Sequence, residues 1–308
     1  RYLRIYGFSD FIYWNVLEQK LAEGVDYSQN AEIESLLSDS LSFDEVKNWT
    51  LRKCYIGAQI LSSICRSTYS GTPNLESLTI RKQVKDRLID AAQRIKIAES
   101  LVKEQKPDLI IIKEANYSKY APITDICVAS EIDVIQVTQP NRDDALVMRR
   151  LNKKTRRQHP SSVSFTSFQS YKDCKLSNSE EEKLDAVMGA RYSGKWFLQS
   201  RNQPNSMVFS KREIVTDLNL DKKKMLAVVF SHVLWDANLF YGEDLFKDYG
   251  DWFEQTVKAA CENPKVNWLI KMHPANLWKR NREGIKGEYA EINLIKDVIG
   301  ELPQHVKI

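Results

Sequence analysis

The sequence predicts an α/β protein built from two strand–helix–strand units. One pair of apolar runs, Met225 to Phe230 and Trp268 to Ile270, is separated by an amphipathic helical stretch. A similar pair, Leu109 to Ile112 and Val134 to Thr138, occurs earlier in the chain. Short, near-continuous apolar runs are typical of strands buried on both faces of a parallel sheet. We therefore expect two separate parallel sheets.

Helices are expected before and within the first unit. The pair Ser42 and Glu45 is a capping-box signature and predicts a helix that runs to about Arg66. Apolar residues at helical spacing predict a second helix from about Leu75 to Glu104, after a break at Gly71-Thr72-Pro73. A short helix at about 122–130 should connect the two strands by a right-handed crossover.

A basic run at 149–157 follows the first unit, with six lysine and arginine residues in nine. We interpret it as the solvated face of a helix, and the alternative is a surface for an acidic acceptor, such as an anionic polysaccharide or a lipid headgroup. The serine-rich stretch 161–170 should be irregular, and Ser179 with Glu182 predicts the start of another helix. The chain should cross between domains at 199–206, which gives a first domain at 1–210 and a second at 211–308.

The second domain should contain helices at about 248–262 and 288–299 and a third strand that begins at His305. From residue 224 to the end there are 308 − 223 = 85 residues, whereas a full domain typically has about 100–150. We therefore expect this domain to be incomplete at its C-terminus, with Val306 and Ile308 in a terminal strand. An unfinished sheet exposes an edge and an apolar face, so the chain should tend to associate.

Composition narrows the class of protein. The hydrophobic fraction of 43% and the charged fraction of 28% are those of a globular protein, and no apolar run reaches the roughly 18 residues of a membrane span. Five scattered cysteines without metal-type spacing indicate reduced thiols and a cytoplasmic protein. A net charge of only +4 disfavours a general nucleic-acid binder.

Two of the four histidines follow predicted strands of the second unit. His232 comes directly after the first strand, and His273 lies in the sequence Lys271-Met-His-Pro after the second. Because adjacent parallel strands end at the same edge of a sheet, we expect the two imidazoles to lie close together, with Lys271 nearby. Histidine can donate a hydrogen bond to phosphate and lysine can add charge, so the pair favours a nucleotide-phosphate site. The alternative is that His273 only caps the end of its strand.

Three strings carry a resemblance to a known family: FSHVLWDAN (230–238), DLFKDYGDWF (244–253) and NPKVNWLIKMHPAN (263–276). They resemble the capsule polysaccharide biosynthesis family, bacterial glycosyltransferases of the GT-B type akin to Kdo transferases. The Lys-X-His-Pro element is also similar to one in CDP-glycerol glycerophosphotransferases of teichoic-acid synthesis and in polysialyltransferases. A looser likeness covers PDLIIIKEANYSKY (107–120) and HPSSVS (159–164).

The resemblance implies a GT-B-like fold, with two Rossmann-like domains facing a cleft, helical elaboration of the first and a truncated second domain. The first domain would then be the acceptor side, and the second would bind a nucleotide-sugar donor as substrate, with no cofactor and no metal. Its donor-binding residues would be Ser231, His232, Lys271, His273 and Asn276. The C-terminal half of that domain, which helps to hold the nucleotide in the family, is expected to be missing, so this piece of chain could be inactive by itself.

Glycosyl transfer also needs a base to activate the acceptor hydroxyl. Glu114, directly after the strand at 109–112, is the candidate catalytic residue, and the alternative is a surface carboxylate paired with a neighbouring lysine. Asp125 and Asp236 are weaker candidates, and Arg191 could steady an anionic substrate or cap its helix. His159 should lie away from the donor site.

Three functions remain open at the level of sequence. The first is a glycosyltransferase that acts on a capsular or surface polysaccharide or a lipid-linked acceptor. The second is transfer of a polyol phosphate from a CDP-linked donor, and the third is a non-catalytic domain that binds nucleotide or polysaccharide. The expected location is the cytoplasm, at the inner face of the cell membrane if the protein associates peripherally with it.

Overall fold

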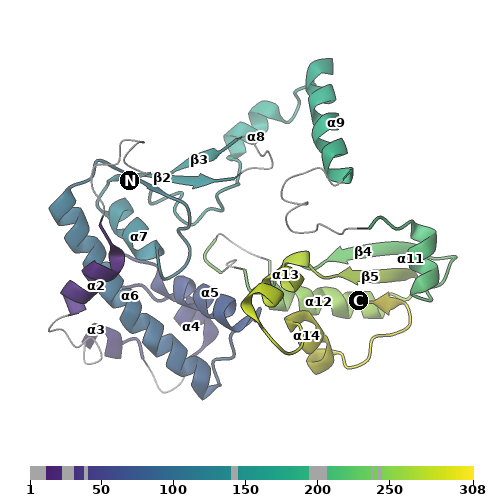
Figure 1. The fold of residues 1–308 in the computed structure, drawn as a ribbon, viewed down its shortest axis with the longest axis horizontal. Coiled ribbons are helices and arrows are strands. Elements are labelled where there is room, and N and C mark those ends of the chain that lie inside the picture. The colour runs from purple at the N-terminus through teal and green to yellow at the C-terminus, as the bar shows by residue number, and fades with distance from the viewer. Residues whose placement is uncertain are drawn as a thin grey trace.

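The protein is an α/β structure with two separate three-stranded sheets (Figure 1). The structure, a computed structural model, describes residues 12–22, 31–37, 41–139, 145–193, 207–236, 239–241 and 245–308. The predicted domain crossing at 199–206 lies outside these ranges. In the described part of the chain no helix is long and apolar enough to cross a membrane. The five cysteines are free thiols, and three of them are buried.

Helices dominate the first part of the chain: α2 (Trp14–Ala22), α3 (Ala31–Glu34), α4 (Phe43–Lys47), α5 (Ile56–Thr68) and α6 (Leu78–Gln105). The predicted capping box is present, because Ser42 Oγ accepts from Glu45 N–H and the Glu45 carboxylate accepts from Ser42 N–H. The prediction of a single helix that reaches Arg66 is wrong, however, because α4 and α5 are separate helices. The chain makes a tight turn in which Arg52 and Lys53 both have positive φ, closed by hydrogen bonds between Leu51 and Cys54, before α5 begins.

The first sheet consists of β1 (Leu109–Ile112), β2 (Asp133–Thr138) and β3 (Val147–Leu151), with α7 (Ala121–Ala129) connecting the first two strands. β1 and β2 are parallel, as predicted, but β3 pairs with β2 in antiparallel orientation. The first sheet is therefore mixed and not wholly parallel. Val134, Leu151 and Cys127 lie in its small core on the side of α7.

The basic run does not form a helix, contrary to the prediction. Arg149 and Arg150 belong to β3, and the rest of the run forms the turns that follow it. Arg156, far from being solvated, is 2% exposed and pairs with Asp125 at 2.5 Å. The charges of this run thus have different environments, and a helical face cannot describe them.

Two helices, α8 (Phe165–Tyr171) and α9 (Asn178–Tyr192), then project from the body of the molecule (Figure 1). α8 lies within a stretch that was expected to be irregular. The capping box of α9 is formed by Ser177 and Glu180, two residues earlier than the pair predicted from sequence. Both pairs have the same spacing, so the sequence alone allowed either register.

The second sheet is parallel throughout, with strands in the order β4 (Met225–Phe230), β5 (Val266–Lys271) and β6 (Val306–Lys307). Val306 lies in the last strand as predicted, whereas Ile308 follows it. The associated helices are α11 (Lys211–Asp217), α12 (Tyr249–Glu262), α13 (Pro274–Glu283) and α14 (Ala290–Val298). Helices α11 and α13 were missed from sequence. Pro274 ends β5 but also occupies the first position of α13, where proline needs no hydrogen-bond donor.

The described residues 231–236 and 239–241, which follow β4, pack into the helical core of the first part of the chain. Val233, Trp235 and Leu239 belong to the same buried cluster as α4, α5 and α6. Arg157 donates to the Phe240 carbonyl at 3.2 Å, and the Phe240 ring lies under the Arg156 guanidinium. This segment, the post-β4 loop, therefore joins the two sheets through apolar contacts.

Candidate functional site

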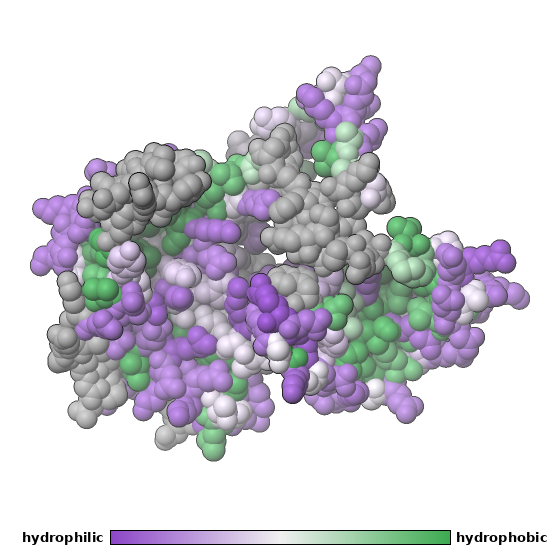
Figure 2. Space-filling view, in the orientation of Figure 1, coloured by the Kyte–Doolittle hydropathy of each residue, from purple (hydrophilic) through white to green (hydrophobic). Residues whose placement is uncertain are grey.

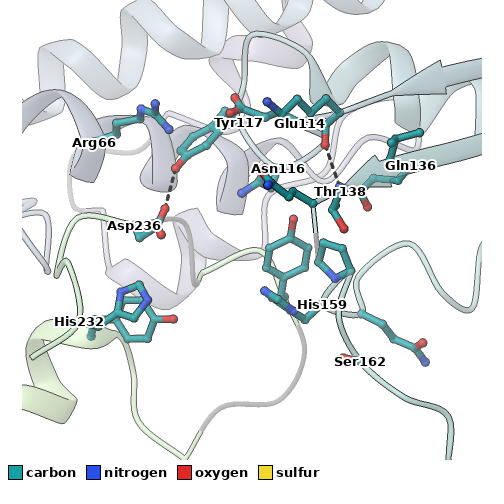
Figure 3. Close-up of a pocket in the computed structure, with 17 residues that line it drawn as sticks. Arg66, Glu114, Asn116, Tyr117, Gln136, Thr138, His159, Ser162, His232 and Asp236 are labelled. Atoms are coloured by element: carbon teal, nitrogen blue, oxygen red, sulfur yellow. Dashed lines mark hydrogen bonds between the residues drawn. The ribbon is translucent and has the colours of Figure 1, made fainter. Parts of the chain in front are cut away.

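A cavity of about 660 Å³ opens between the loops that follow β1 and β2 and the post-β4 loop (Figure 3). Polar ends of parallel strands of both sheets thus meet at one site, as expected for ligand sites of α/β proteins. The lining residues combine amides, hydroxyls, aromatic rings and charged groups from both parts of the chain: Arg66, Lys113, Glu114, Asn116, Tyr117, Gln136, Val137, Thr138, Gln139, Gln158, His159, Pro160, Ser162, His232, Asp236, Tyr241 and Tyr249.

His232 and His273 lie side by side, with ring centroids 6.1 Å apart. The cause is the register of the second sheet, in which Phe230 pairs with Lys271, so that the two strands end together. On its other side His232 contacts the ring of Tyr249 at the start of α12, with centroids 4.6 Å apart. The proximity of the two histidines is confirmed.

The hydrogen bonds of these imidazoles determine which nitrogen can face a ligand. His273 is the N-cap of α13, and its Nδ1 accepts from the backbone N–H of Ala275 at 3.1 Å. In the neutral ring the proton is therefore on Nε2, which leaves a donor for a ligand. His232 Nδ1 lies 3.2 Å from the Val233 carbonyl, which can only accept, so its Nδ1 carries a proton. Partial desolvation and the neighbouring His232 lower the pKa of His273, an effect that the charge of Asp236 opposes.

Asp236 and Tyr117 connect the two walls of the cavity. The Tyr117 hydroxyl donates to Asp236 Oδ1 at 3.1 Å, and this bond is visible in Figure 3. The guanidinium carbon of Arg66 lies 4.8 Å from the centre of the Tyr117 ring. Burial and the Asp236 charge raise the pKa of Tyr117, so its hydroxyl remains a donor across the physiological pH range.

Glu114 lines the same cavity as His232, on the wall that follows β1. The backbone here is held by Gln136 Nε2, which donates to the Lys113 carbonyl at 3.2 Å. Glu114 itself is exposed, so its carboxylate can meet a ligand. The sequence therefore indicated one carboxylate and one histidine that the fold brings to a single cavity.

The other predicted donor residues have different surroundings. Asn276 is buried and uses both ends of its amide, accepting from Trp235 Nε1 at 3.1 Å and donating to Glu291 at 2.5 Å. Ser231 is also buried, beside the same carboxylate of Glu291. Lys271 is exposed at the end of β5 and contacts the Phe230 ring, with its Nζ 5.9 Å from the centroid. These three residues do not line the cavity, and neither does His273, which lies beside the lining residue His232.

Three further candidate residues have surroundings that bear on their predicted roles. Asp125 is fully buried and accepts from Tyr55 N–H and Gln59 Nε2, besides its ion pair, so it cannot reach a substrate. Arg191 lies in the last turn of α9 and does not line the cavity. His159 does line it, with its ring edge-on to Tyr241 at 5.1 Å, and so it is not distant from His232.

The sequence signal for several lining residues was weak. Gln136 is a polar residue inside an apolar strand, and such a buried amide could have been noticed. Arg66 lies in a segment without a motif, and Tyr117 lies in the string 107–120 but was not identified there as a site residue. In the described ranges, no group of three or more His, Cys, Asp or Glu side chains is arranged to hold a metal ion.

A buried lysine lies behind the donor-side loops. The Nζ of Lys279, on α13, is 3.8 Å from the centroid of the Trp235 ring and 5.5 Å from that of Tyr69. Burial and the nearby charges of Arg66 and Arg282 lower the pKa of Lys279 to about 8. The ammonium is thus held mainly by aromatic faces, an interaction that persists in a desolvated site.

Comparisons of the chain with protein-family models, with curated proteins and with solved structures find no match.

Proposed function

We propose that the protein is a glycosyltransferase that moves a sugar from a nucleotide-activated donor to a hydroxyl of a polysaccharide or glycolipid acceptor. The observation that carries this proposal is the single cavity lined by Glu114 after β1 and by His232 after β4, on two different sheets. In a GT-B-like arrangement, which we propose for the two sheets and their helices, donor and acceptor meet in such a place. The segments 1–210 and 211–308 would be the acceptor-side and donor-side domains.

On the donor side, His273 would bind the phosphate next to the sugar, and His232 would join it in the protonated form, in which Nε2 also carries a proton. The cap bond from Ala275 leaves His273 Nε2–H as a donor, and the hydrogen bond of a donor N–H to a charged phosphate is worth about 1.5–3 kcal/mol. The N-terminus of α13, which His273 caps, adds the positive end of a helix dipole. Asn276 would act from behind, because it holds Glu291 and Trp235 and thereby the loop that carries His232, and Ser231 lies buried next to His232 in the same loop.

On the acceptor side, Glu114 would take the proton from the attacking hydroxyl. The acceptor oxygen then bonds to the anomeric carbon, the bond from that carbon to the phosphate oxygen breaks, and the nucleotide leaves with the electron pair. The His273 Nε2–H would stabilise the charge that develops on the leaving phosphate. Asp236 lies in the same cavity but already accepts from Tyr117, which favours Glu114 as the base.

The neutral groups of the acceptor-side wall are suited to a carbohydrate. Asn116, Gln136 and Thr138 present amides and a hydroxyl to the cavity, and Tyr241 presents an aromatic ring. Amides and hydroxyls can pair with sugar hydroxyls in either direction, because they include both donors and acceptors. Arg66 adds a positive charge at the same wall, which would favour an acidic sugar unit.

The experiment that tests the donor site compares His273→Asn with His273→Ala. Asparagine is a favourable N-cap residue. His273→Asn therefore keeps α13 while it removes the imidazole. We expect both variants to bind the nucleotide sugar at least about tenfold more weakly in calorimetry, since 1.4 kcal/mol corresponds to one decade. The donor is first identified by screening CMP-, CDP-, UDP- and GDP-sugars with the full-length protein. Normal affinity in His273→Asn would show that His273 is only a cap.

Glu114→Gln separates catalysis from binding. This variant should bind the donor normally and lose at least about a hundredfold in turnover, because general-base catalysis typically contributes a factor of 10²–10⁴. Transfer of a polyol phosphate to the acceptor by the wild-type protein would indicate the CDP-linked reaction instead. Donor binding without turnover in the wild-type protein would leave a binding domain and contradict the proposal.

A further inference from the structure

Helices α8 and α9 form an arm that is not buried on the body of its own chain. All residues from 161 to 189, here called the arm, are exposed; α8 follows β3 closely and α9 projects from the body of the molecule in Figure 1, which Figure 2 shows as a protrusion. Both helices are nevertheless well formed and start at serine caps, Ser164 for α8 and Ser177 for α9. A helix as short as α8 is marginal in water by itself, so packing against another surface is expected.

The arm carries an apolar stripe. Phe165, Phe168 and Tyr171 recur every three residues along α8 and are 75%, 56% and 74% exposed. The stripe continues on α9 with further exposed apolar side chains: Leu184, Val187 and Met188. An apolar surface of this extent on a folded chain marks an interaction site.

The charge of the arm argues against a membrane as its partner. The arm contains three lysines and five acidic residues, a net charge of −2. Four of the acidic residues lie in the first half of α9, at 180–182 and at Asp185. Lipid surfaces of the cytoplasmic leaflet are negative and attract basic segments. The partner of the arm should therefore combine an apolar surface with positive charge.

The first sheet of the same chain presents such a surface. Among the described residues, apolar side chains on its face opposite α7 are largely uncovered, and Ile111 and Met148 there are each 67% exposed. A parallel pair of strands is normally covered on both faces. At the edge of this sheet a second cavity, of about 680 Å³, is lined by apolar residues from the α7 side, Val128, Ile132 and Leu151. Its charged residues are three cations and two carboxylates: Arg150 pairs with Asp133 and Lys153 with Glu131, while Lys154 is the third cation, so the lining has a net charge of +1, opposite in sign to that of the arm.

We propose that the arm of one copy of the chain packs on the face opposite α7 of the first sheet of a second copy. Each chain carries both complementary surfaces, and β3, from which the arm departs, is the outer strand of its sheet in the described structure. A two-fold axis near β3 would place each arm on the partner's sheet, so that every contact occurs twice. One buried aromatic ring covers about 150–250 Å². The three rings of each arm thus bring the contact close to the roughly 1,600 Å² of a standard interface.

Disulfide trapping between two different chains tests whether the arm that covers the first sheet belongs to the same chain or to a second copy. One chain carries Met148→Cys together with Cys174→Ser, and the other is the wild-type chain, whose Cys174 lies exposed on the arm between α8 and α9. Mild oxidation of the mixture should join the two chains. The matched control replaces the first chain by one that carries Cys174→Ser alone, and it should give no such product.

An arm that folds onto its own sheet would give a different result. In a single chain with Met148→Cys and native Cys174, it would form an intramolecular disulfide, while the mixed experiment would give no heterodimer. That outcome would overturn the proposal. So would capture of the control chain at the same yield.

Sedimentation equilibrium measures the energetic part of the prediction. Wild-type protein should dimerise reversibly, and the variant Phe165→Ser, Phe168→Ser should weaken the dimer at least about thirtyfold, as expected when dominant interface side chains are lost. Leu78→Ser is the control, because Leu78 is an equally exposed apolar residue (82%) on α6 outside the arm. It should leave the dimer constant unchanged. A chain that stays monomeric at 100 µM (roughly the upper range of such interfaces), or a dimer insensitive to the arm substitutions, would refute the proposal.

Discussion

Replacing Arg156 by methionine should destabilise the fold far more than replacing its neighbour in sequence, Arg150. Both arginines belong to the same basic run and both form an ion pair with an aspartate. The pair of Arg156 with Asp125 is 2% and 1% exposed, whereas the pair of Arg150 with Asp133 is 69% and 37% exposed. The two substitutions are therefore matched in chemistry and differ in burial.

The expected magnitude follows from what remains after the change. In Arg156→Met the Asp125 carboxylate keeps its bonds from Tyr55 N–H and Gln59 but loses its counter-ion. The Ala115 carbonyl also loses a donor, and Phe240 loses the cation over its ring. Removing one partner of a buried pair typically costs about 3–5 kcal/mol. The Arg150→Met substitution should cost less than about 1 kcal/mol, as is usual for exposed pairs.

Urea unfolding at neutral pH, followed by tryptophan fluorescence and by far-UV circular dichroism, measures both costs. A double variant, Asp125→Leu with Arg156→Met, removes both charges and should be more stable than Arg156→Met alone. A loss below about 1 kcal/mol in Arg156→Met, equal to that of Arg150→Met, would contradict the argument that the buried pair organises this region.

The pH dependence of Arg156→Met gives a second test of the same argument. Burial already raises the pKa of Asp125, and the Arg156 guanidinium opposes this rise. Without the guanidinium the pKa of Asp125 in the folded protein rises further above its unfolded value of about 3.9. The folded variant then binds more protons than the unfolded chain, so its stability increases as the pH falls. The gap between variant and wild type should narrow from pH 7 to pH 5.

Three further changes have expected outcomes. Gly71→Ala should destabilise the fold by about 1–3 kcal/mol, because a Cβ there would lie 2.8 Å from the Cα of Gly250. Gly189→Ala, whose added Cβ would have no neighbouring atom within 4 Å, should instead stabilise α9 by up to about 1 kcal/mol. Thermal unfolding measures both changes. Lys279→Met should be more stable than wild type at pH 7, because the pKa of Lys279 in the folded protein, about 8, lies below the unfolded value. The stability of the wild type should therefore rise between pH 8 and about 10.5, and urea titrations should show the difference between the two proteins closing over this range. Tyr117→Phe should cost about 1–3 kcal/mol because it removes the hydrogen bond that the Tyr117 hydroxyl donates to Asp236, and an unchanged urea midpoint would argue against that bond.

The sequence was most informative where an apolar run has one physical explanation. The runs at 109–112, 133–138 and 225–230 are short, rich in isoleucine and valine, and followed by polar residues, and all three are strands. The proximity of His232 and His273 could be predicted for the same reason, because parallel neighbours with matched register end at the same edge. Local pattern and tertiary structure agree at these positions.

The failures occur where one local pattern allows two structures. The sequence of β3, Val-Met-Arg-Arg-Leu, has charges because the strand lies at the edge of its sheet, and the same composition is typical of a solvated helix. Pro274 can end a strand or begin a helix, and here it does both. The burial of Arg156 depends on Asp125, thirty-one positions away, and no local pattern reveals such a partner.

The post-β4 loop explains why the candidate site could be predicted only in part. Its cavity residues, His232 and Asp236, alternate with Val233 and Trp235, which are anchored in the helical core of the first part of the chain. The position of His232 relative to Glu114 is therefore set by apolar packing between segments more than a hundred residues apart. A sequence pattern can identify each residue that follows a strand, but it contains no information on how two sheets are joined. The packing of the buried side chains of this loop thus sets the distance between the two walls of the cavity. Substitutions of Trp235 should therefore change the shape of the cavity, although Trp235 does not line it.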